Sequence, residues 1–467
     1  MLQSKRRIHI NRERKGDTNV TNKHKLDFTK YPLLNTIKQG QEVFWKNPML
    51  LKTEEATNQT AYSVKDIEDV EARLQRFAHF IRVAYPETED TKGIIESPLS
   101  DITDMKQYLN SVNESTVEGQ FLLKRDDLLP ISGTIKARGA IYEVLKHAET
   151  LALKEGLLKD IHDDYALFAS EAFQRFFSDY TIAVGTTGNL GISVGTMGRQ
   201  LGFNVTVHMS VEAKQWKKDY LREKGVNVIE HDTDFSKAVE NGRAESDADP
   251  KSYFVDDEHS VELFLGYTVG GMRMKKQLAE QGITVDADHP LFMYLPCGIG
   301  GSPGGITFGL KQAFGEHVHC FFAEPTKMPS MLMGLSTEQY DNVSVFDLEL
   351  GGLTIADGLA VPRTSGLVAK LMKNLFSGGY SVKDEVFKGL LHRLYEEEGV
   401  FLEPAAVAGL IGPYRMLSSE DGQAYLEENK LTSKLANATH IAWATGGSMV
   451  PVKDREAFLE DAARYPL

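Results

Sequence analysis

The sequence predicts an α/β protein with two domains, in which parallel or mixed sheets are flanked by helices. Three observations lead to this prediction. The chain has 467 residues, which is too many for one ordinary hydrophobic core. From about residue 120 onward, short β-rich runs alternate with helical periods of apolar residues. Strand–helix alternation over such a length is typical of parallel sheets that helices cover on both faces.

The composition excludes several classes of protein. Hydrophobic residues make up 42% of the chain and charged residues 25%, as in globular proteins that remain in water. No run approaches the ~18 consecutive apolar residues that a membrane span needs. The two cysteines, Cys297 and Cys320, cannot build a disulfide scaffold or a thiolate zinc site. We therefore expect a cytoplasmic protein with no membrane partner.

The charge distribution separates a short N-terminal segment from the rest. The formal net charge is -14, which argues against a nucleic-acid partner for the body of the protein. Residues 1–25 are instead basic, with Glu13 and Asp17 as their acidic residues. Because this run has neither aromatic residues nor an amphipathic period, we expect residues 1–26 to form a flexible basic tail rather than a nucleic-acid or membrane arm.

The predicted strands follow one another in a regular order. A strand at 121–123 precedes a helix whose apolar face includes Ile141 and Val144, and a strand at 181–184 precedes a helix with Leu190 and Val194 on its apolar face. Further strands are expected at 205–207, 226–229, 291–295, 318–323 and 440–444. Ligands of such folds lie beyond the carboxyl ends of the strands, so the loops after residues 123, 184, 295 and 444 are the candidate site.

The first of these loops contains Lys136, in the run Ser132-Gly-Thr-Ile-Lys136-Ala-Arg-Gly139. A lysine in the first turn of a helix lies in a positive field. This field and partial desolvation are expected to lower the pKa of its amine, which would then serve as a nucleophile or base. By itself the motif also fits a solvated surface lysine.

The second loop, Val184-Gly-Thr-Thr-Gly-Asn189-Leu-Gly191, joins a strand to the start of a helix. Its free backbone N–H groups and hydroxyls suit an anion, and a substrate carboxylate is the natural guest. Asn189 either caps the helix or donates its amide to a cofactor oxygen. Residues 191–195 also match the hydrolase motif G-x-S-x-G, but Ser193 lies within the helical period and not on the turn that this motif requires.

The third loop has five glycines among residues 298–305, directly after a strand. The dinucleotide spacing G-x-G-x-x-G fails because Pro303 stands where the last glycine is needed, and no Gly-Lys-Ser/Thr follows. What remains is a phosphate cup of another type, in which glycine allows the backbone to approach the phosphate closely. The fourth loop places the hydroxyl of Thr445 at the end of its strand.

Together these loops resemble those of the pyridoxal-phosphate enzymes of fold type II, which are related to the tryptophan synthase β-subunit. The chain is more closely similar to the bacterial D-serine dehydratases (D-serine ammonia-lyases), from about residue 30 to residue 451. The stretches that carry the resemblance are LPISGTIKARGAIYEVL, VGTTGNLGISVG, FLGY, LFMYLPCGIGG, HVHCFFAEPT and ADGLAV. Ser302 and Ser448 stand where the family usually has glycine, so a positive φ there would carry strain.

The resemblance implies a cofactor site between the two domains. Lys136 would hold the aldehyde of pyridoxal 5'-phosphate as a Schiff base and later act as the catalytic base. Asn189 would bond the ring hydroxyl, and Thr445 would face the ring nitrogen. The cofactor phosphate would lie against the backbone of Gly298, Ile299, Gly300 and Gly301.

The resemblance also implies the substrate and the reaction. The amino acid D-serine, and D-threonine as a second substrate, would lose water and ammonia, and D-serine would give pyruvate. An L-serine or L-threonine dehydratase and a serine racemase are the alternatives, whereas the intact Lys136 argues against a binding protein without chemistry. Thr187 would lie nearest the reacting atoms, and the substrate-binding residues would be Ser132, Thr186, Thr187, Gly188 and Asn189.

Related dehydratases bind a monovalent cation, for which Glu324 is a candidate ligand, although a helix cap is an equally good role for this carboxylate. The large cofactor-binding domain is expected to comprise residues 27–136 and 261–467. Residues 137–260 would form the small domain that carries the Asn189 loop. The resemblance further implies a monomer.

Overall fold

The structure is a computed structural model that describes residues 26–186, 188–232 and 235–467. Its described strands form two sheets, one of seven strands in the order β1-β10-β9-β8-β11-β3-β2 and one of four in the order β6-β5-β4-β7. The strands are β1 Phe44–Lys46, β2 Leu99–Asp101, β3 Gln120–Arg125, β4 Thr181–Gly185, β5 Asn204–Ser210, β6 Asn227–His231, β7 Ser252–Val255, β8 Leu291–Pro296, β9 Val318–Pro325, β10 Gly378–Val382 and β11 Thr439–Ala444.

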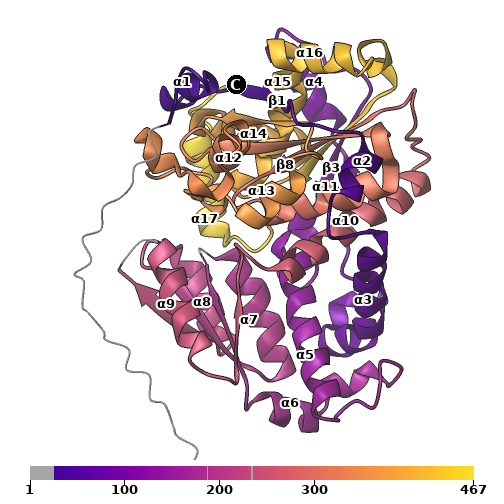
Figure 1. Ribbon diagram of the computed structural model, residues 1–467, viewed down its shortest axis with the longest axis vertical. Coiled ribbons are helices and arrows are strands. Elements are labelled where there is room, and N and C mark those ends of the chain that lie inside the picture. Colours follow the sequence, from indigo (N-terminus) through magenta and orange to yellow (C-terminus); the bar gives the residue numbers. More distant parts are fainter. Residues whose placement is uncertain (1–25, 187, 233–234) are drawn as a thin grey trace, which may run out of the picture.

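Helices surround both sheets. In the upper half of Figure 1, α11 to α16 lie around the seven-stranded sheet, and in the lower half α7, α8 and α9 lie beside the four-stranded sheet. The α-helices are α1 Leu33–Lys38, α2 Thr53–Asn58, α3 Val64–Ala84, α4 Thr103–Val112, α5 Tyr142–Lys154, α6 Glu171–Phe177, α7 Asn189–Leu201, α8 Gln215–Glu223, α9 Phe235–Asp247, α10 Val261–Glu280, α11 Gly301–Phe314, α12 Ser330–Ser336, α13 Gly366–Met372, α14 Asp384–Glu398, α15 Gly412–Ser418, α16 Glu420–Glu428 and α17 Val452–Ala462.

The strand directions confirm the predicted α/β fold with parallel and mixed sheets. The four-stranded sheet is parallel throughout. In the larger sheet the five inner strands are parallel, and the edge strands β1 and β2 run antiparallel to their neighbours. Every residue of β8, β9 and β11 is buried, as expected for parallel strands that are covered on both faces.

The seven strands expected from the sequence are present, but four others were not predicted. β1 and β2 have three residues each, too few to show a period of two. β7 has four residues, and β10 begins with Gly378-Gly379, which weakens a strand pattern. Short or glycine-rich strands depend on their neighbours in the sheet, so local sequence does not reveal them.

The chain contributes differently to the two sheets. All strands of the four-stranded sheet lie within residues 137–260, whereas the seven-stranded sheet takes strands from both sides of that segment. Helix α3 comes from the segment 27–136 and packs beside α5 and the short turn Tyr165–Ala169, where Phe77 and Tyr165 are in edge-to-face contact at 4.8 Å between ring centroids. The domain boundaries remain predictions. The tail at residues 1–25 lies outside the described residues.

Helices α10 and α11 cross closely, and their glycines make this possible. A Cβ on Gly309 would lie 2.0 Å from the carbonyl oxygen of Thr268, and one on Gly271 would lie 2.4 Å from that of Ile306. The backbones therefore pack directly against each other. This crossing matters for the site because α11 begins at the glycine loop after β8, and α10 begins after the loop that follows β7.

Across the residues that the structure describes, no helix combines the length and the apolar character that a bilayer span requires.

The crossing of α10 and α11 predicts a specific stability defect. Gly309→Ala places a methyl group against backbone that cannot move aside, so the free energy of unfolding is expected to fall by about 2 kcal/mol or more. Urea unfolding measures the change. Lys276→Ala, on the exposed side of α10, is the control and should change stability by less than about 0.5 kcal/mol. Equal stabilities of the Gly309→Ala protein and the wild type would contradict the tight crossing.

Candidate active site

The predicted loops surround one cavity. Parallel pairing of β8 with β11 and of β11 with β3 places the carboxyl ends of these strands at the same edge of the large sheet, and the loop after β4 faces them from the other sheet. The predicted site residues that line the cavity are Lys136, Thr186, Asn189, Gly298, Ile299, Gly300, Gly301 and Thr445. Segments that lie more than 300 residues apart in sequence thus meet, as the end-of-strand rule predicts.

The loop that carries Lys136 is joined to the loop after β11. The backbone N–H of Ile135 and the hydroxyl of Thr134 both donate to the carbonyl oxygen of Thr445, each at 2.9 Å. A single π-helical turn, Ala137–Ile141, follows Lys136 and leads into α5. Such turns are rare and occur frequently at functional sites.

The Lys136 amine faces the carboxylate of Asp257, at 2.9 and 3.1 Å from its two oxygens. Burial lowers the pKa of Lys136, but the charge of Asp257 and the nearby Tyr267 hydroxyl outweigh burial, so the pKa lies above its ordinary value. The expectation of a lowered pKa was therefore wrong. The expectation rested on the helix field and on burial alone, because Asp257 lies 121 residues away in sequence and its contact with Lys136 could not be foreseen.

The hydroxyl of Tyr267, on α10, lies close to the Lys136 amine. The Tyr267 side chain is fully buried. Burial raises its pKa, and the nearby Lys136 amine lowers it. Its ring lies against the backbone of Gly139, where a Cβ would come within 2.7 Å of it.

A buried ionic network holds the lysine loop on the sheet. The Arg138 guanidinium donates to both oxygens of Asp126, at 2.7 and 2.8 Å. The indole N–H of Trp443, on β11, donates to the same carboxylate at 2.7 Å. Glu96 accepts from Arg138 and from the Lys124 amine of β3. Because the charges are paired and hydrogen-bonded, the network can remain buried and fix the loop to β3 and β11.

The loop that carries Asp257 is anchored as well. The hydroxyls of Ser260 and Tyr253 donate to the two oxygens of Glu143, at 2.7 and 2.8 Å. The Ser365 hydroxyl donates to the carbonyl oxygen of Glu258 at 2.5 Å. Burial raises the pKa of Glu143 to about 7, with its two hydroxyl partners opposing the shift.

The glycine loop after β8 leads directly into α11, which begins at Gly301. Neither a side-chain cap nor an acidic residue satisfies the first turn of this helix, so its free N–H groups and the positive end of its dipole face the cavity. Gly300 has φ +112°, and a Cβ there would lie 2.4 Å from Cε of Met331. This backbone forms a cradle that suits an anion.

Asn189 begins α7 and donates through Nδ2 to Oε2 of Glu403 at 2.9 Å. The other oxygen of Glu403 lies 3.4 Å from the Lys217 amine, and the backbone N–H of Glu403 donates to the carbonyl oxygen of Gly446. Thr186 accepts the Gly188 N–H through its hydroxyl, at 2.9 Å. Glu403 therefore connects the Asn189 loop to the loop after β11.

Other predicted substrate-binding residues lie elsewhere. Ser132 does not line the cavity, because its hydroxyl is hydrogen-bonded to that of Ser193 at 2.9 Å. Gly188 is also absent from the lining, although Thr186 and Asn189 of the same loop contribute to it. Thr187 lies outside the described residues. Ser193 is buried within α7, so the hydrolase motif is a packing feature here, as expected.

Ser302 and Ser448 do not have positive φ values, so the strain that was considered for them is absent. Ser302 lies in the first turn of α11, where any residue adopts the helical backbone. The glycine at position 300 takes the left-handed conformation instead. This difference could not be inferred from the loop composition alone.

Glu324, at the buried end of β9, accepts the backbone N–H groups of Met331 and Leu332 at 2.7 and 2.9 Å. Burial raises its pKa to about 8. Glu324 thus binds the first turn of α12 from outside that helix, and it is not a cap of a helix beginning at Pro325 as the sequence had suggested. A role for Glu324 as a cation ligand remains a prediction.

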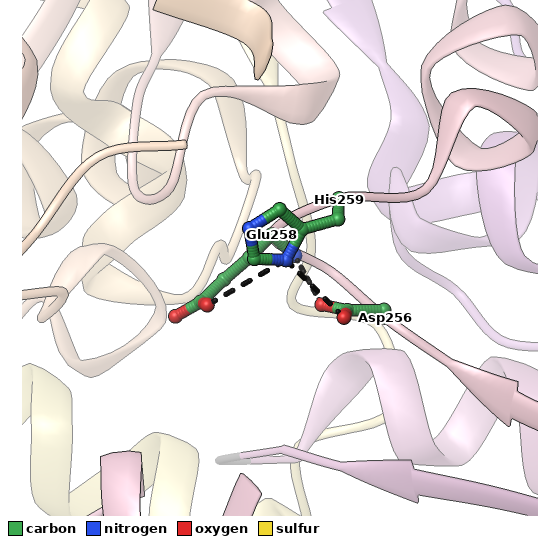
Figure 2. A group of neighbouring side chains, drawn as sticks. All are labelled: Asp256, Glu258 and His259. Atoms are coloured by element: carbon green, nitrogen blue, oxygen red, sulfur yellow. Dashed lines mark hydrogen bonds and ion pairs between the residues drawn. The ribbon is translucent and has the colours of Figure 1, made fainter. Parts of the chain in front are cut away.

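Among the described residues, one group of three side chains has the spacing of metal ligands, namely Asp256, Glu258 and His259 (Figure 2). It does not include Glu324. The Arg243 guanidinium lies 2.8 Å from Asp256 and 3.7 Å from Glu258, so a cation already balances these carboxylates. The group therefore serves the packing of the loop around Asp257.

Asp257, Lys217 and Glu403 line the cavity but were not predicted. Asp257 follows β7, whose short sequence gave no strand signal. Lys217 lies in α8, between the predicted strands at 205–207 and 226–229, and nothing in the local sequence distinguished it from the other lysines there. A carboxylate directly before Pro404 was the weak signal for Glu403, since proline favours the first turn of a helix.

Comparisons with known proteins agree with this geometry. The family model of pyridoxal-phosphate dependent enzymes matches residues 97–423. The "Probable D-serine dehydratase" of Geobacillus stearothermophilus is 55% identical over 434 residues, 93% of this chain and 94% of that protein. The protein of the same name from Bacillus anthracis is 55% identical over 421 residues, 90% of this chain and 94% of its own.

Solved structures share the fold at low sequence identity. Escherichia coli diaminopropionate ammonia lyase in complex with D-serine superposes with a TM-score of 0.67 at 17% identity, over 90% of this chain and 97% of that one. A fungal L-serine ammonia-lyase from Rhizomucor miehei has a TM-score of 0.58 at 17% identity, over 80% and 99% of the two chains. The chain therefore belongs to the pyridoxal-phosphate-dependent enzymes of fold type II, in the family that includes these D-serine dehydratase relatives.

Proposed function

We propose that this protein catalyses the pyridoxal-phosphate-dependent elimination of water from D-serine, which yields pyruvate and ammonia. The observation that carries the proposal is a lysine in one cavity with an uncapped, glycine-rich helix N-terminus. The names of relatives that are 55% identical over most of the chain support the choice of D-serine. D-threonine is proposed as a second substrate.

The residues fit the cofactor. A phosphate needs backbone N–H donors and no competing carboxylate, and the first turn of α11 meets both conditions. A Cβ at Gly300 would collide with Met331, and φ there is +112°, so the turn that shapes the cradle depends on glycine. When bound, pyridoxal phosphate supplies an aldehyde that condenses with amines and a ring that withdraws electrons from the substrate α-carbon.

Four groups of this chain would hold the cofactor. The backbone of Gly298, Ile299, Gly300 and Gly301 would bind the phosphate. Asn189 donates to Glu403 through one N–H of its amide and keeps the other for the ring hydroxyl. Thr445 would be the residue at the ring nitrogen, where a hydroxyl cannot fix a proton as a carboxylate does. Loss of a β-hydroxyl suits this arrangement better than transamination, which needs a more stabilised carbanion.

Lys136 acts as both the attachment point and the base. Its Nζ would be the group that takes the proton from the substrate α-carbon. Asp257, which lies 2.9 Å from Nζ, stabilises the ammonium that this transfer creates. Attachment of the cofactor and proton removal both follow from the position of Lys136, at the end of the loop after β3 and in the cavity.

The loop of residues 186–189 would bind the substrate carboxylate through backbone N–H groups and hydroxyls, with Thr187 nearest the reacting atoms. We propose no direct substrate contact for Ser132, whose hydroxyl is bonded to Ser193. A monovalent cation at Glu324, a monomeric state and a cytoplasmic location remain predictions.

Replacing Lys136 tests the assigned chemistry. Lys136→Ala is expected to abolish the visible absorbance of the lysine-bound cofactor and to lower pyruvate formation from D-serine by about 10³-fold or more. Lys276→Ala, which removes an exposed amine, should retain both. Pyruvate formation by Lys136→Ala at the wild-type rate would refute the assignment.

The same assay separates the alternative substrates. Wild-type enzyme is expected to form pyruvate from D-serine faster than from L-serine. Pyruvate from L-serine alone would identify an L-serine dehydratase, and interconversion of the two serines would identify a racemase.

The phosphate cradle predicts a defect in cofactor binding. Gly300→Ala places a methyl group where the backbone is left-handed and Met331 is close, so the Kd for pyridoxal phosphate is expected to rise by about tenfold or more. Gly315→Ala is a matched control, since Gly315 ends the same helix with φ +59° and has open space around its Cβ position. Spectroscopic titration of cofactor-free protein measures both. Equal Kd values for the two variants would contradict the cradle.

A further inference from the structure

A second lysine, Lys217, lines the cavity that holds Lys136. It lies in the first turn of α8, beside the four-stranded sheet, and its side chain is only 4% exposed. A buried ammonium is costly unless negative or polar groups surround it. Packing alone therefore does not explain why a lysine ammonium is buried at this cavity.

The amine of Lys217 has N–H groups that are not used in short hydrogen bonds to Glu403. Its ion-pair partner among the described residues is Glu403, at 3.4 Å, which is longer than the ~2.7–2.9 Å of a charge-assisted hydrogen bond. Oε2 of Glu403 meanwhile accepts from Asn189. Burial lowers the pKa of Lys217, but Glu403 and Asp357 outweigh burial and raise it, so the group remains an ammonium with three N–H donors.

The stem of Lys217 lies directly against Gly188. A Cβ on Gly188 would come within 2.3 Å of Cδ and 3.3 Å of Nζ of this lysine. The ammonium thus sits beside the backbone to which the substrate carboxylate is assigned. The charged side chains that line the cavity are Lys136, Asp257, Lys217 and Glu403.

The two positive and two negative charges balance, but the two ion pairs differ in how closely their partners approach. Lys136 lies between both oxygens of Asp257 at hydrogen-bond distance, whereas Lys217 has a looser contact with Glu403. An incoming carboxylate adds a negative charge, and Lys217 is the cation whose donors can meet it.

We propose that Lys217 binds the carboxylate of the amino-acid substrate, with Glu403 holding the ammonium in position. The inference rests on the proposed function and deepens it, because it names the residue that selects free amino acids. The enzyme then discriminates against amides of the same amino acids, which lack the negative charge. A lysine that merely joined the two sheets would not distinguish acid from amide.

The test compares two ligands that differ in this charge alone. D-alanine has the amine and carboxylate of the substrate without a β-hydroxyl, and D-alaninamide lacks the negative charge. Binding to the cofactor-loaded protein is followed through the visible spectrum. In Lys217→Met the Kd for D-alanine is expected to rise by about 10- to 100-fold, while that for D-alaninamide changes by less than about threefold.

A neighbouring lysine provides the matched control. Lys218, also buried on α8, pairs with Glu230 at 2.7 Å and does not line the cavity. Lys218→Met should leave the preference for D-alanine over D-alaninamide unchanged. If Lys217→Met does not fold, Lys217→Gln, which keeps a donor without the charge, takes its place and should lose the same preference.

Three results would overturn the proposal. These are an unchanged Kd for D-alanine in the Lys217 variant, an equal weakening of both ligands, and a wild-type protein with no preference for D-alanine. Equal weakening would mark Lys217 as a structural link between the two sheets. Failure of the proposed function is separate, since it is measured as pyruvate formation by the wild type and D-alanine cannot lose water.

Discussion

The parallel pairing of β8, β11 and β3 is the constraint on which the rest of the site depends. Adjacent parallel strands end at the same edge of a sheet, so their following loops must meet there. The two hydrogen bonds from Thr134 and Ile135 to the carbonyl oxygen of Thr445 then fix the lysine loop against the last strand. The close crossing of α10 and α11 sets the glycine cradle beside it.

Paired charges are the second organising feature. The cavity contains two lysines and two carboxylates, and each amine faces one carboxylate from a distant part of the chain. Beneath it, Arg138 and Lys124 pair with Asp126 and Glu96 in the same manner. Buried charge pairs are stable only when their geometry is well defined. They therefore hold an amine in a fixed position, as a site needs when that amine must exchange its partner during a reaction.

The parts of this account that depend on local sequence could be predicted, and those that depend on distant contacts could not. The four loops and their helices were recognised because glycine and hydroxyl residues follow predicted strands, whereas Lys136 was singled out by the resemblance to known enzymes. Asp257 was missed, since it meets Lys136 across 121 residues, and the direction of the pKa shift was missed with it. Glu403, which meets Asn189 across 214 residues, was hidden in the same way.

The most direct test of the central claim asks which lysine carries the cofactor, because both Lys136 and Lys217 line the cavity. The loaded protein would be reduced with borohydride, digested and analysed by mass spectrometry. The account predicts a pyridoxyl group on the peptide that contains Lys136 and none on the peptide that contains Lys217. A pyridoxyl group on Lys217, or on neither lysine, would contradict it.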